Sequence, residues 1–212
     1  ADCITFSNRN VFLTGKAGTG KTTFLKYIRE NCAKQMVVMA PTGVAAINAG
    51  GTTIHSFFQL PFTPYIPESA GGFFAQNVSS AATDKHHLLG RLKYSRDKID
   101  VLQKLELLII DEISMVRCDV LDAIDIILRS FRYRHQEAFG GVQVLLIGDM
   151  YQLPPVTVQD EWQILSSFYE SPYFFDSRVM QQQKPVYIEL EKIYRQTDNS
   201  FIQLLNKIRH GE

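Results

Sequence analysis

Near the N-terminus, glycines, a lysine and hydroxyl residues stand at a spacing that binds phosphate groups. Residues 15–22 read GKAGTGKT and match GxxxxGK[ST] between an apolar segment and a helical pattern, which disfavours a glycine-rich turn without a ligand. Backbone N–H groups in such a turn lie at the positive end of the helix dipole and face an anion. We expect Lys21 to reach the β and γ phosphates of a nucleotide, and the Thr22 hydroxyl to bind magnesium. The expected nucleotide-contacting set is Gly15, Ala17, Gly18, Thr19, Gly20, Lys21, Thr22 and Thr23.

An acidic pair, Asp111 and Glu112, follows the apolar segment 107–110. Asp111 can hold magnesium through its water shell, and Glu112 can orient or deprotonate an attacking water. In isolation such a pair is typical of a solvated turn, but together with a phosphate-binding loop it predicts hydrolysis. GTPase switches typically use a glutamine to orient the water, so a glutamate here also argues against that class.

A third polar group follows the apolar segment 142–147, in the sequence GDMYQLPPV at 148–156. Parallel strands end at the same edge of a sheet, so Gln152 is expected near the phosphate-binding loop and Asp111. An uncharged amide there could report whether the γ phosphate is present, and Pro154 and Pro155 would stiffen the exit. The alternative is an ordinary surface turn.

The segments between these groups predict an α/β fold with a mostly parallel, doubly wound sheet. The expected strands are 11–13, 36–39, 107–110 and 142–147. Helical patterns cover 22–30 and the residues around 45–47, and they recur at Val120, Ile124, Ile127 or Leu128, Phe131, and at Phe201, Leu204, Leu205, Ile208. Residues 61–97 break the alternation with prolines, paired glycines and a basic end, and such a long stretch predicts an inserted subdomain.

Composition narrows the class of protein. The 212 residues are 45% hydrophobic and 21% charged with a formal net charge of zero, so any case for nucleic-acid binding must be local. No apolar stretch approaches the roughly 18 residues that cross a membrane, and membrane partners are not expected. The three cysteines show no CxxC spacing and are read as reduced thiols. We expect a cytoplasmic location in a bacterium, or a nuclear or mitochondrial one in a eukaryote.

Six blocks together resemble one family. They are GKAGTGKTT, APTGVAA, GGTTIHSFF, LLIIDEISM, GDMYQLPPV and YRQTDNSFIQLLNKIRHG, in this order along most of the chain. They are similar to the Pif-one (petite integration frequency) DNA helicases, relatives of RecD in helicase superfamily one. The resemblance implies a RecA-like P-loop domain, ATP and Mg²⁺ as cofactors, and five-prime to three-prime movement on single-stranded DNA. It also implies roles in DNA repair, recombination and telomere maintenance.

The resemblance assigns further residues by position. Segments that grip the DNA backbone correspond to Pro41, Thr42, Gly43, Thr53, His55, Ser56 and Phe57. Hydroxyl and imidazole groups can donate to phosphates, and Phe57 or Phe58 could stack on a base. The alternatives are that at least one of these rings is core and that His55 is a packing residue. Arg195 corresponds to an arginine that stabilises the transferred phosphoryl group, or else is an ordinary surface residue.

The implied domain organisation is a RecA-like motor domain at 1–60 and 98–212 and a wedge-like subdomain at 61–97. The basic end of the insertion would touch forked or structured DNA, or be a solvated charged face. A second RecA-like domain, which should close over the nucleotide, is absent from the chain, so we expect a fragment with weak activity alone. A glutamine motif for adenine is not evident in residues 1–10.

Other functions stay open from the sequence. One is a RecD-like or relaxase-associated helicase subunit of the same fold. Another is a nucleotide-switched DNA-binding module without motor activity, whose ATP turnover DNA would leave unchanged. A structural ATPase with a degraded site is disfavoured, because Lys21, Thr22, Asp111, Glu112 and Gln152 are all present.

Overall fold

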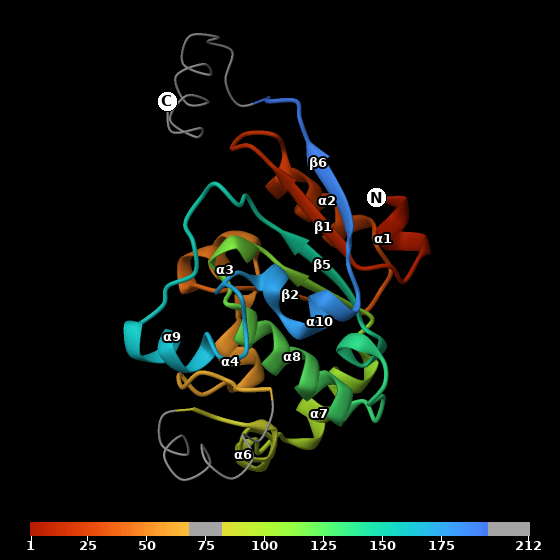
Figure 1. The fold of residues 1–212 in the computed structure, drawn as a ribbon. Coiled ribbons are helices and arrows are strands. Elements are labelled where there is room, and N and C mark those ends of the chain that lie inside the picture. The colour runs from red at the N-terminus through yellow and green to blue at the C-terminus, as the bar shows by residue number, and fades with distance from the viewer. Residues whose placement is uncertain (68–81, 195–212) are drawn as a thin grey trace.

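A parallel β-sheet runs through the part of the chain that the computed structural model describes, residues 1–67 and 82–194 (Figure 1). Within these residues the strand order is β3-β2-β4-β5-β1-β6, and all neighbouring strands pair in parallel. The strands are β1 (Val11–Gly15), β2 (Met36–Ala40), β3 (Thr52–Thr53), β4 (Leu107–Ile110), β5 (Gln143–Ile147) and β6 (Val186–Leu190). Because they all point the same way, their carboxyl ends form one edge.

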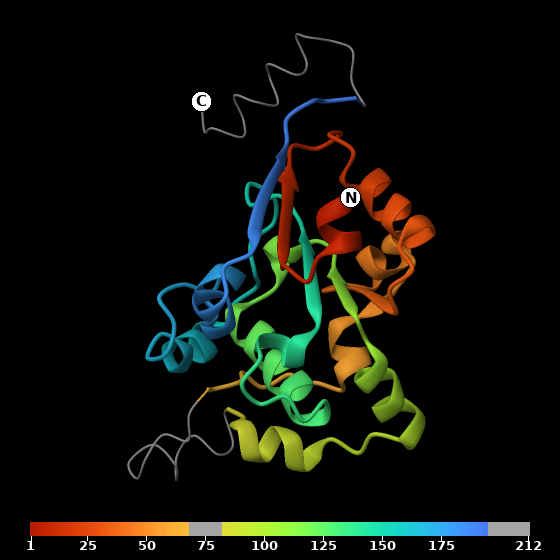
Figure 2. The same cartoon turned by 90° about the vertical axis from the view of Figure 1, so that its right-hand side faces the viewer.

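Helices cover both faces of this sheet, and β4 shows why. All four of its residues are buried, and successive side chains point to opposite faces. Leu107 and Ile109 belong to a core cluster with α2 (Lys21–Asn31). Leu108 and Ile110 belong to the cluster on the other face, with α8 (Cys118–Phe131). Figure 2 shows the red N-terminal helix and α2 on one side of the sheet and the blue helices on the other.

The remaining helices follow the same two-layer arrangement. On the side of α2 lie α1 (Asp2–Phe6) and α3 (Gly43–Ala49). On the side of α8 lie α4 (Ile54–Phe58), α6 (Lys85–Arg91), α7 (Arg96–Lys104) and α10 (Arg178–Gln182). Helix α9 (Gln159–Leu165) packs with Ile66 and Cys118 in a small separate cluster. Among the described residues, no helix has both the length and the apolar character that crossing a membrane requires.

Helix α8 buries charged side chains as well as apolar ones. Asp119, Asp122, Asp125 and Arg129 are each at most 9% exposed. The aspartates accept backbone N–H groups from other segments, Asp119 from Tyr65, Asp122 from Arg178 and Val179, and Asp125 from Phe139. Burial raises the pKa of Asp122 to about 6, although these N–H groups and the Tyr169 hydroxyl favour the carboxylate. Hydrogen bonds therefore join helix α8 to three distant segments. The buried carboxylates need these bonds to replace the water that they lose on folding.

The described ends of the 61–97 region pack on the main core. Tyr65 and Leu88 are 6% and 1% exposed and belong to the same cluster as α8. The Tyr94 hydroxyl donates to the Phe58 carbonyl oxygen at 2.6 Å. Residues 68–81 lie outside the described residues, so the wedge-like subdomain stays a prediction.

The predicted α/β fold is confirmed. The four predicted strands are present, and α2, α3 and α8 begin and end within a few residues of the predicted helices. Two strands are not evident from the sequence pattern. Strand β3 is only two residues long, and β6 is an edge strand with three exposed residues, so neither forms an unbroken apolar run. The helical pattern at 201–208 lies outside the described residues.

Candidate functional site

The loop between β1 and α2 carries the phosphate-binding motif. Gly18 and Gly20 have φ angles of 81° and 101°, which glycine adopts readily and other residues do not. The Lys21 side chain folds into the loop, where Nζ donates to the carbonyl oxygens of Gly15 at 2.6 Å and Lys16 at 3.1 Å. Around it, Thr19 is buried, whereas Ala17, Thr22 and Thr23 are exposed. These three residues are therefore accessible to a ligand.

The carboxyl end of β4 places Asp111 and Glu112 near this lysine. Burial raises the pKa of both carboxyl groups, and the Asp111 charge raises that of Glu112 further. The positive charge of Lys21 opposes both shifts, so the three groups lie within electrostatic reach of one another. Glu112 adopts a left-handed conformation, with φ 53° and ψ 45°. Such a conformation costs about 1–2 kcal/mol outside glycine and is common at functional sites.

The carboxyl end of β5 adds Asp149 and Gln152. Asp149 is 1% exposed, and its charge also raises the pKa of Glu112. Its carboxylate accepts the Tyr151 N–H at 3.1 Å and the Gln152 amide at 3.4 Å. Gln152 itself is exposed. Thus Lys21, Asp111, Glu112 and Gln152 lie at one edge of the sheet, as the parallel order predicts, and Asp149 interacts with both Glu112 and Gln152.

Gly148 shows how tightly this edge is packed. A Cβ atom at this position would lie 2.8 Å from Ile113 Cγ2 and 3.1 Å and 3.2 Å from the backbone nitrogens of Ile113 and Ser114. We expect Gly148→Ala to lower the free energy of unfolding by about 1–3 kcal/mol, because the backbone after Glu112 must move. Urea unfolding measures this loss. Gly90→Ala is the matched control, since its Cβ would meet nothing within 4 Å. Equal stability of the two variants would contradict the prediction.

The carboxyl ends of β2 and β3 carry the residues assigned to DNA. Thr42 precedes α3 and accepts the Ala45 N–H at 3.2 Å, and Thr53 precedes α4 and accepts the Ser56 N–H at 3.3 Å. Each hydroxyl therefore caps a helix and keeps its own hydrogen to donate. Pro41 is partly exposed, and Gly43 and Ser56 are exposed. These residues lie at the same edge of the sheet as the phosphate-binding loop. Strands β4 and β5 lie between the two groups.

The aromatic residues of this region have different environments. Phe58 is fully buried, which confirms that at least one of the pair is core. Phe57 contacts Phe58 edge-on, and Lys98 Nζ lies 2.9 Å from the centre of its ring. Base stacking by Phe57 would require Lys98 to move, and it stays a prediction. His55 instead stacks on Phe62, with ring centres 5.5 Å apart and an interplanar angle of 15°.

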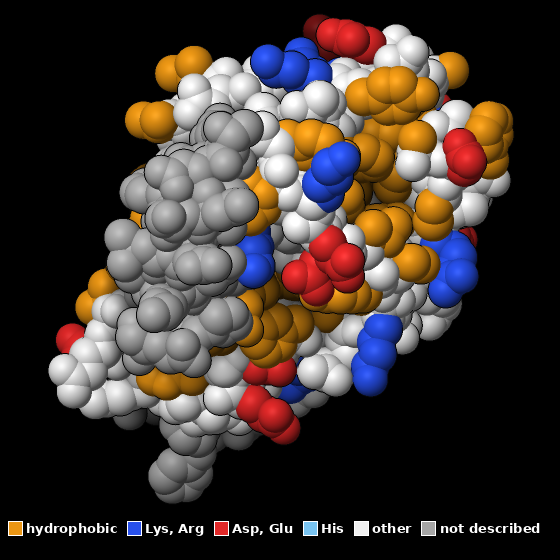
Figure 3. All heavy atoms as spheres, turned by 90° about the horizontal axis from the view of Figure 1, so that it is seen from above, with side chains coloured by type: hydrophobic (Ala, Val, Ile, Leu, Met, Phe, Trp, Pro, Cys, Tyr) orange, Lys and Arg blue, Asp and Glu red, His pale blue; other side chains and the backbone are white. Residues whose placement is uncertain are grey.

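Charge around this edge is mixed. In the part of the face that Figure 3 shows in colour, Lys and Arg side chains lie singly among hydrophobic and acidic ones. Burial, together with the nearby Arg117 charge, lowers the pKa of His55, so its ring is neutral at neutral pH. Phosphate binding here would rest on hydrogen-bond donors rather than on a strongly basic surface.

The last predicted catalytic residue, Arg195, lies outside the described residues. The residue before it, Tyr194, donates its backbone N–H to the carbonyl oxygen of Gly18 at 2.9 Å. Sequence reasoning also misses Asp149 and Arg117. Asp149 stands two residues after the end of the buried strand β5, and that position is the signal that could reveal it. Arg117 lies in the approach to α8, where nothing in the spacing distinguishes it from a surface residue.

Comparison with known proteins decides the family. The family model for PIF1-like helicase matches residues 2–70 and 70–212. The chain belongs to the PIF1-like helicase family. It is 34% identical over 208 residues to the ATP-dependent DNA helicase RRM3 of Saccharomyces cerevisiae, covering 96% of this chain and 25% of that protein. It is 36% identical over 205 residues to human ATP-dependent DNA helicase PIF1, covering 96% and 28%.

Solved PIF1-like helicases have the same fold. Bacteroides Pif1 bound to single-stranded DNA matches with a TM-score of 0.81 and 50% identity, covering 95% of this chain and 42% of that one. Bacteroides Pif1 in complex with ADP-AlF3 and single-stranded DNA matches with a TM-score of 0.82 and 49% identity, covering 96% and 43%. The chain thus spans less than half of the solved structures and about a quarter of the curated relatives.

Proposed function

We propose that this chain is the ATP-hydrolysing motor domain of a DNA helicase that moves five-prime to three-prime on single-stranded DNA. The observation that carries the proposal is the shared sheet edge. There the ends of β1 and β4 bring Lys21, Asp111 and Glu112 together, and the ends of β2 and β3 place Thr42 and Thr53 farther along the same edge. The printed names of the relatives, ATP-dependent DNA helicases, support it.

The phosphate-binding loop fits a nucleotide. A Cβ at Gly20 would meet nothing within 4 Å, so the start of α2 is open to a ligand. The Lys21 ammonium donates hydrogen bonds to carbonyl oxygens of the loop. It therefore lies within the loop that would hold the β and γ phosphates. Backbone N–H groups of the loop would orient the triphosphate. The complexes of Bacteroides Pif1 with ADP-AlF3 and ADP-AlF4 support ATP as the nucleotide.

Two oxygen-bearing groups fit magnesium. The Thr22 hydroxyl is exposed at the start of α2, and Asp111 is within electrostatic reach of Lys21. Hydroxyl and carboxylate oxygens are the ligands that Mg²⁺ takes, usually one or two from the protein. When bound, Mg²⁺ would neutralise part of the negative charge of the phosphates. Glu112 would accept a proton from the attacking water, and Gln152 would contact the γ phosphate and report its presence. Arg195 is proposed to stabilise the transferred phosphoryl group.

The DNA strand is proposed to cross the ends of β2 and β3. The Thr42, Thr53 and Ser56 hydroxyls and the His55 ring would donate to phosphate oxygens, alongside Pro41, Gly43 and Phe57. Forked or structured DNA and a second RecA-like domain are the proposed partners, with residues 61–97 as a wedge at the fork. The location would be cytoplasmic in a bacterium and nuclear or mitochondrial in a eukaryote.

Single-stranded DNA should stimulate ATP turnover. The proposed ATP site and the proposed DNA contacts share one edge of the sheet. DNA bound at the ends of β2 and β3 can therefore change the geometry of the ATP site. We expect the intact protein to hydrolyse ATP several-fold faster with oligo(dT) than without it, measured by phosphate release. Double-stranded blunt DNA of the same length is the control. Equal rates with and without oligo(dT) would favour the nucleotide-switched binding module instead.

A further inference from the structure

A cavity of about 380 Å³ lies directly beside the proposed DNA-contacting residues. Thr42 and His55 form part of its wall, and its volume lies in the range of about 300–1,000 Å³ for sites that hold small ligands. The rest of the wall is mainly apolar and comes from α4, α8 and the segment after Pro155, for example Ile54, Val120 and Val156. An apolar hollow next to phosphate donors is suited to a flat, weakly polar group joined to a phosphate chain.

Phe62 stands at this cavity with its ring largely exposed. It is 87% exposed and stacks on the His55 ring, which is neutral at neutral pH. Of the aromatic residues near the DNA-contacting segments, Phe58 is fully buried and Phe57 lies beneath Lys98. The second face of the Phe62 ring is therefore the surface that can accept another flat ring.

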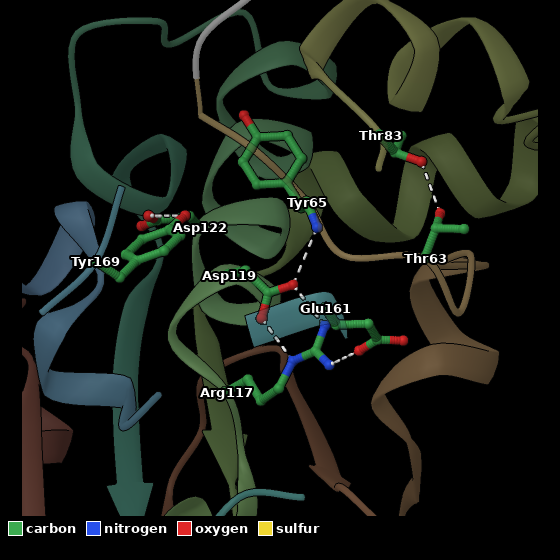
Figure 4. Close-up of polar contacts among 8 residues, drawn as sticks. All are labelled: Thr63, Tyr65, Thr83, Arg117, Asp119, Asp122, Glu161 and Tyr169. Atoms are coloured by element: carbon green, nitrogen blue, oxygen red, sulfur yellow. Dashed lines mark hydrogen bonds and ion pairs between the residues drawn. The ribbon is translucent and has the colours of Figure 1, made fainter. Parts of the chain in front are cut away.

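Polar groups on the wall already bind one another (Figure 4). The Arg117 guanidinium donates to both oxygens of Asp119 at 2.8 Å and also to Glu161. Asp119 accepts the Tyr65 N–H at 3.0 Å, and the hydroxyls of Thr63 and Thr83 are 2.7 Å apart. These contacts hold the walls in place and use part of the hydrogen-bonding capacity that could otherwise read the edge of a base. Recognition by such a wall would depend on stacking and shape rather than on sequence.

We propose that Phe62, stacked on His55, is a platform for one unstacked nucleobase of single-stranded DNA, which the adjoining cavity receives. This inference rests on the proposed function, since the phosphates on either side would lie on Thr42 and the neighbouring donors. Purine and pyrimidine bases would bind alike, because every base offers a flat face.

The test compares Phe62→Ala with Phe62→Trp in the intact protein. Affinities are measured by fluorescence anisotropy for oligo(dT) and for a chain of equal length made of abasic sites. We expect Phe62→Ala to bind oligo(dT) about tenfold more weakly, with unchanged affinity for the abasic chain, because only base stacking is lost. Phe62→Trp should restore binding. Phe6→Ala is the matched control, since Phe6 is 82% exposed on α1, outside the proposed site.

Each outcome decides the inference. An unchanged affinity of Phe62→Ala for oligo(dT), or an equal loss on both chains, would overturn it while leaving single-strand binding intact. A loss on oligo(dT) but not on oligo(dA) would also overturn it. If the unmodified protein binds neither chain, the proposed function itself fails.

Discussion

Replacing Glu112 by glutamine is expected to lower ATP turnover by about 10²- to 10⁴-fold while nucleotide binding is retained. The amide keeps the size of the side chain but cannot accept a proton from water. Lys21 and the loop glycines, which would hold the phosphates, are untouched. Turnover is measured by phosphate release with oligo(dT) present, and binding by titration with a fluorescent ATP analogue.

Glu30→Gln provides the matched control for this experiment. Glu30 is exposed near the end of α2, and its replacement removes the same charge away from the sheet edge. Its turnover should equal that of the unmodified protein. If Glu112→Gln keeps more than half of the normal rate, Glu112 is not the group that activates water. Loss of nucleotide binding in that variant would show instead that the residue shapes the loop.

Replacing Arg117 by leucine should lower the free energy of unfolding by about 3–5 kcal/mol. Burial opposes the charge of this guanidinium, yet contacts with Asp119 and Glu161 outweigh the burial and raise its pKa. The substitution leaves the Asp119 carboxylate, which is 1% exposed, without its charged partner. Urea unfolding followed by circular dichroism measures the change.

Two controls separate the effect of leaving a buried charge unpaired from the effect of removing any arginine. Arg134→Leu removes an arginine whose ion pair with Glu137 is about half exposed, and it should change stability by less than about 1 kcal/mol. The double variant Arg117→Leu/Asp119→Leu removes both members of the buried pair but leaves the Tyr65 N–H without its acceptor, so it should regain only part of the loss. Equal losses in the Arg117 and Arg134 variants would refute the role given to the buried pair.

The sheet and the phosphate-binding edge could be predicted from the sequence because their signals are local. The segment 107–110 is apolar throughout since β4 is buried on both faces, and the loop motif needs only a strand before it and a helix after it. Parallel order then brings Lys21, Asp111 and Gln152 to one edge. The edge strand β6 escapes this reasoning, because its exposed residues weaken the apolar pattern.

The polar contacts of α8 could not be predicted, since they join residues far apart in the chain. Asp119 and Asp122 stand three residues apart, a spacing that normally indicates a solvated helix face. Their partners are backbone groups at Tyr65 and at Arg178 and Val179, which no sequence pattern connects to them. The stacking of His55 on Phe62 is hidden for a related reason. Phe57 and Phe58 lie nearer in sequence, but packing occupies both rings.

The segment from Asp149 to Glu161 is fixed at both ends although much of it has no regular secondary structure. Asp149 is buried at the end of β5, and Glu161 is paired with Arg117. Surface connections usually tolerate changes of length. The segment 149–161 is held at both ends. An added or deleted residue would therefore displace either Asp149, at the carboxyl edge of the sheet, or Glu161, in the wall of the cavity. It is therefore a poor place for an affinity tag, a fluorescent label or a loop exchange, despite its exposure.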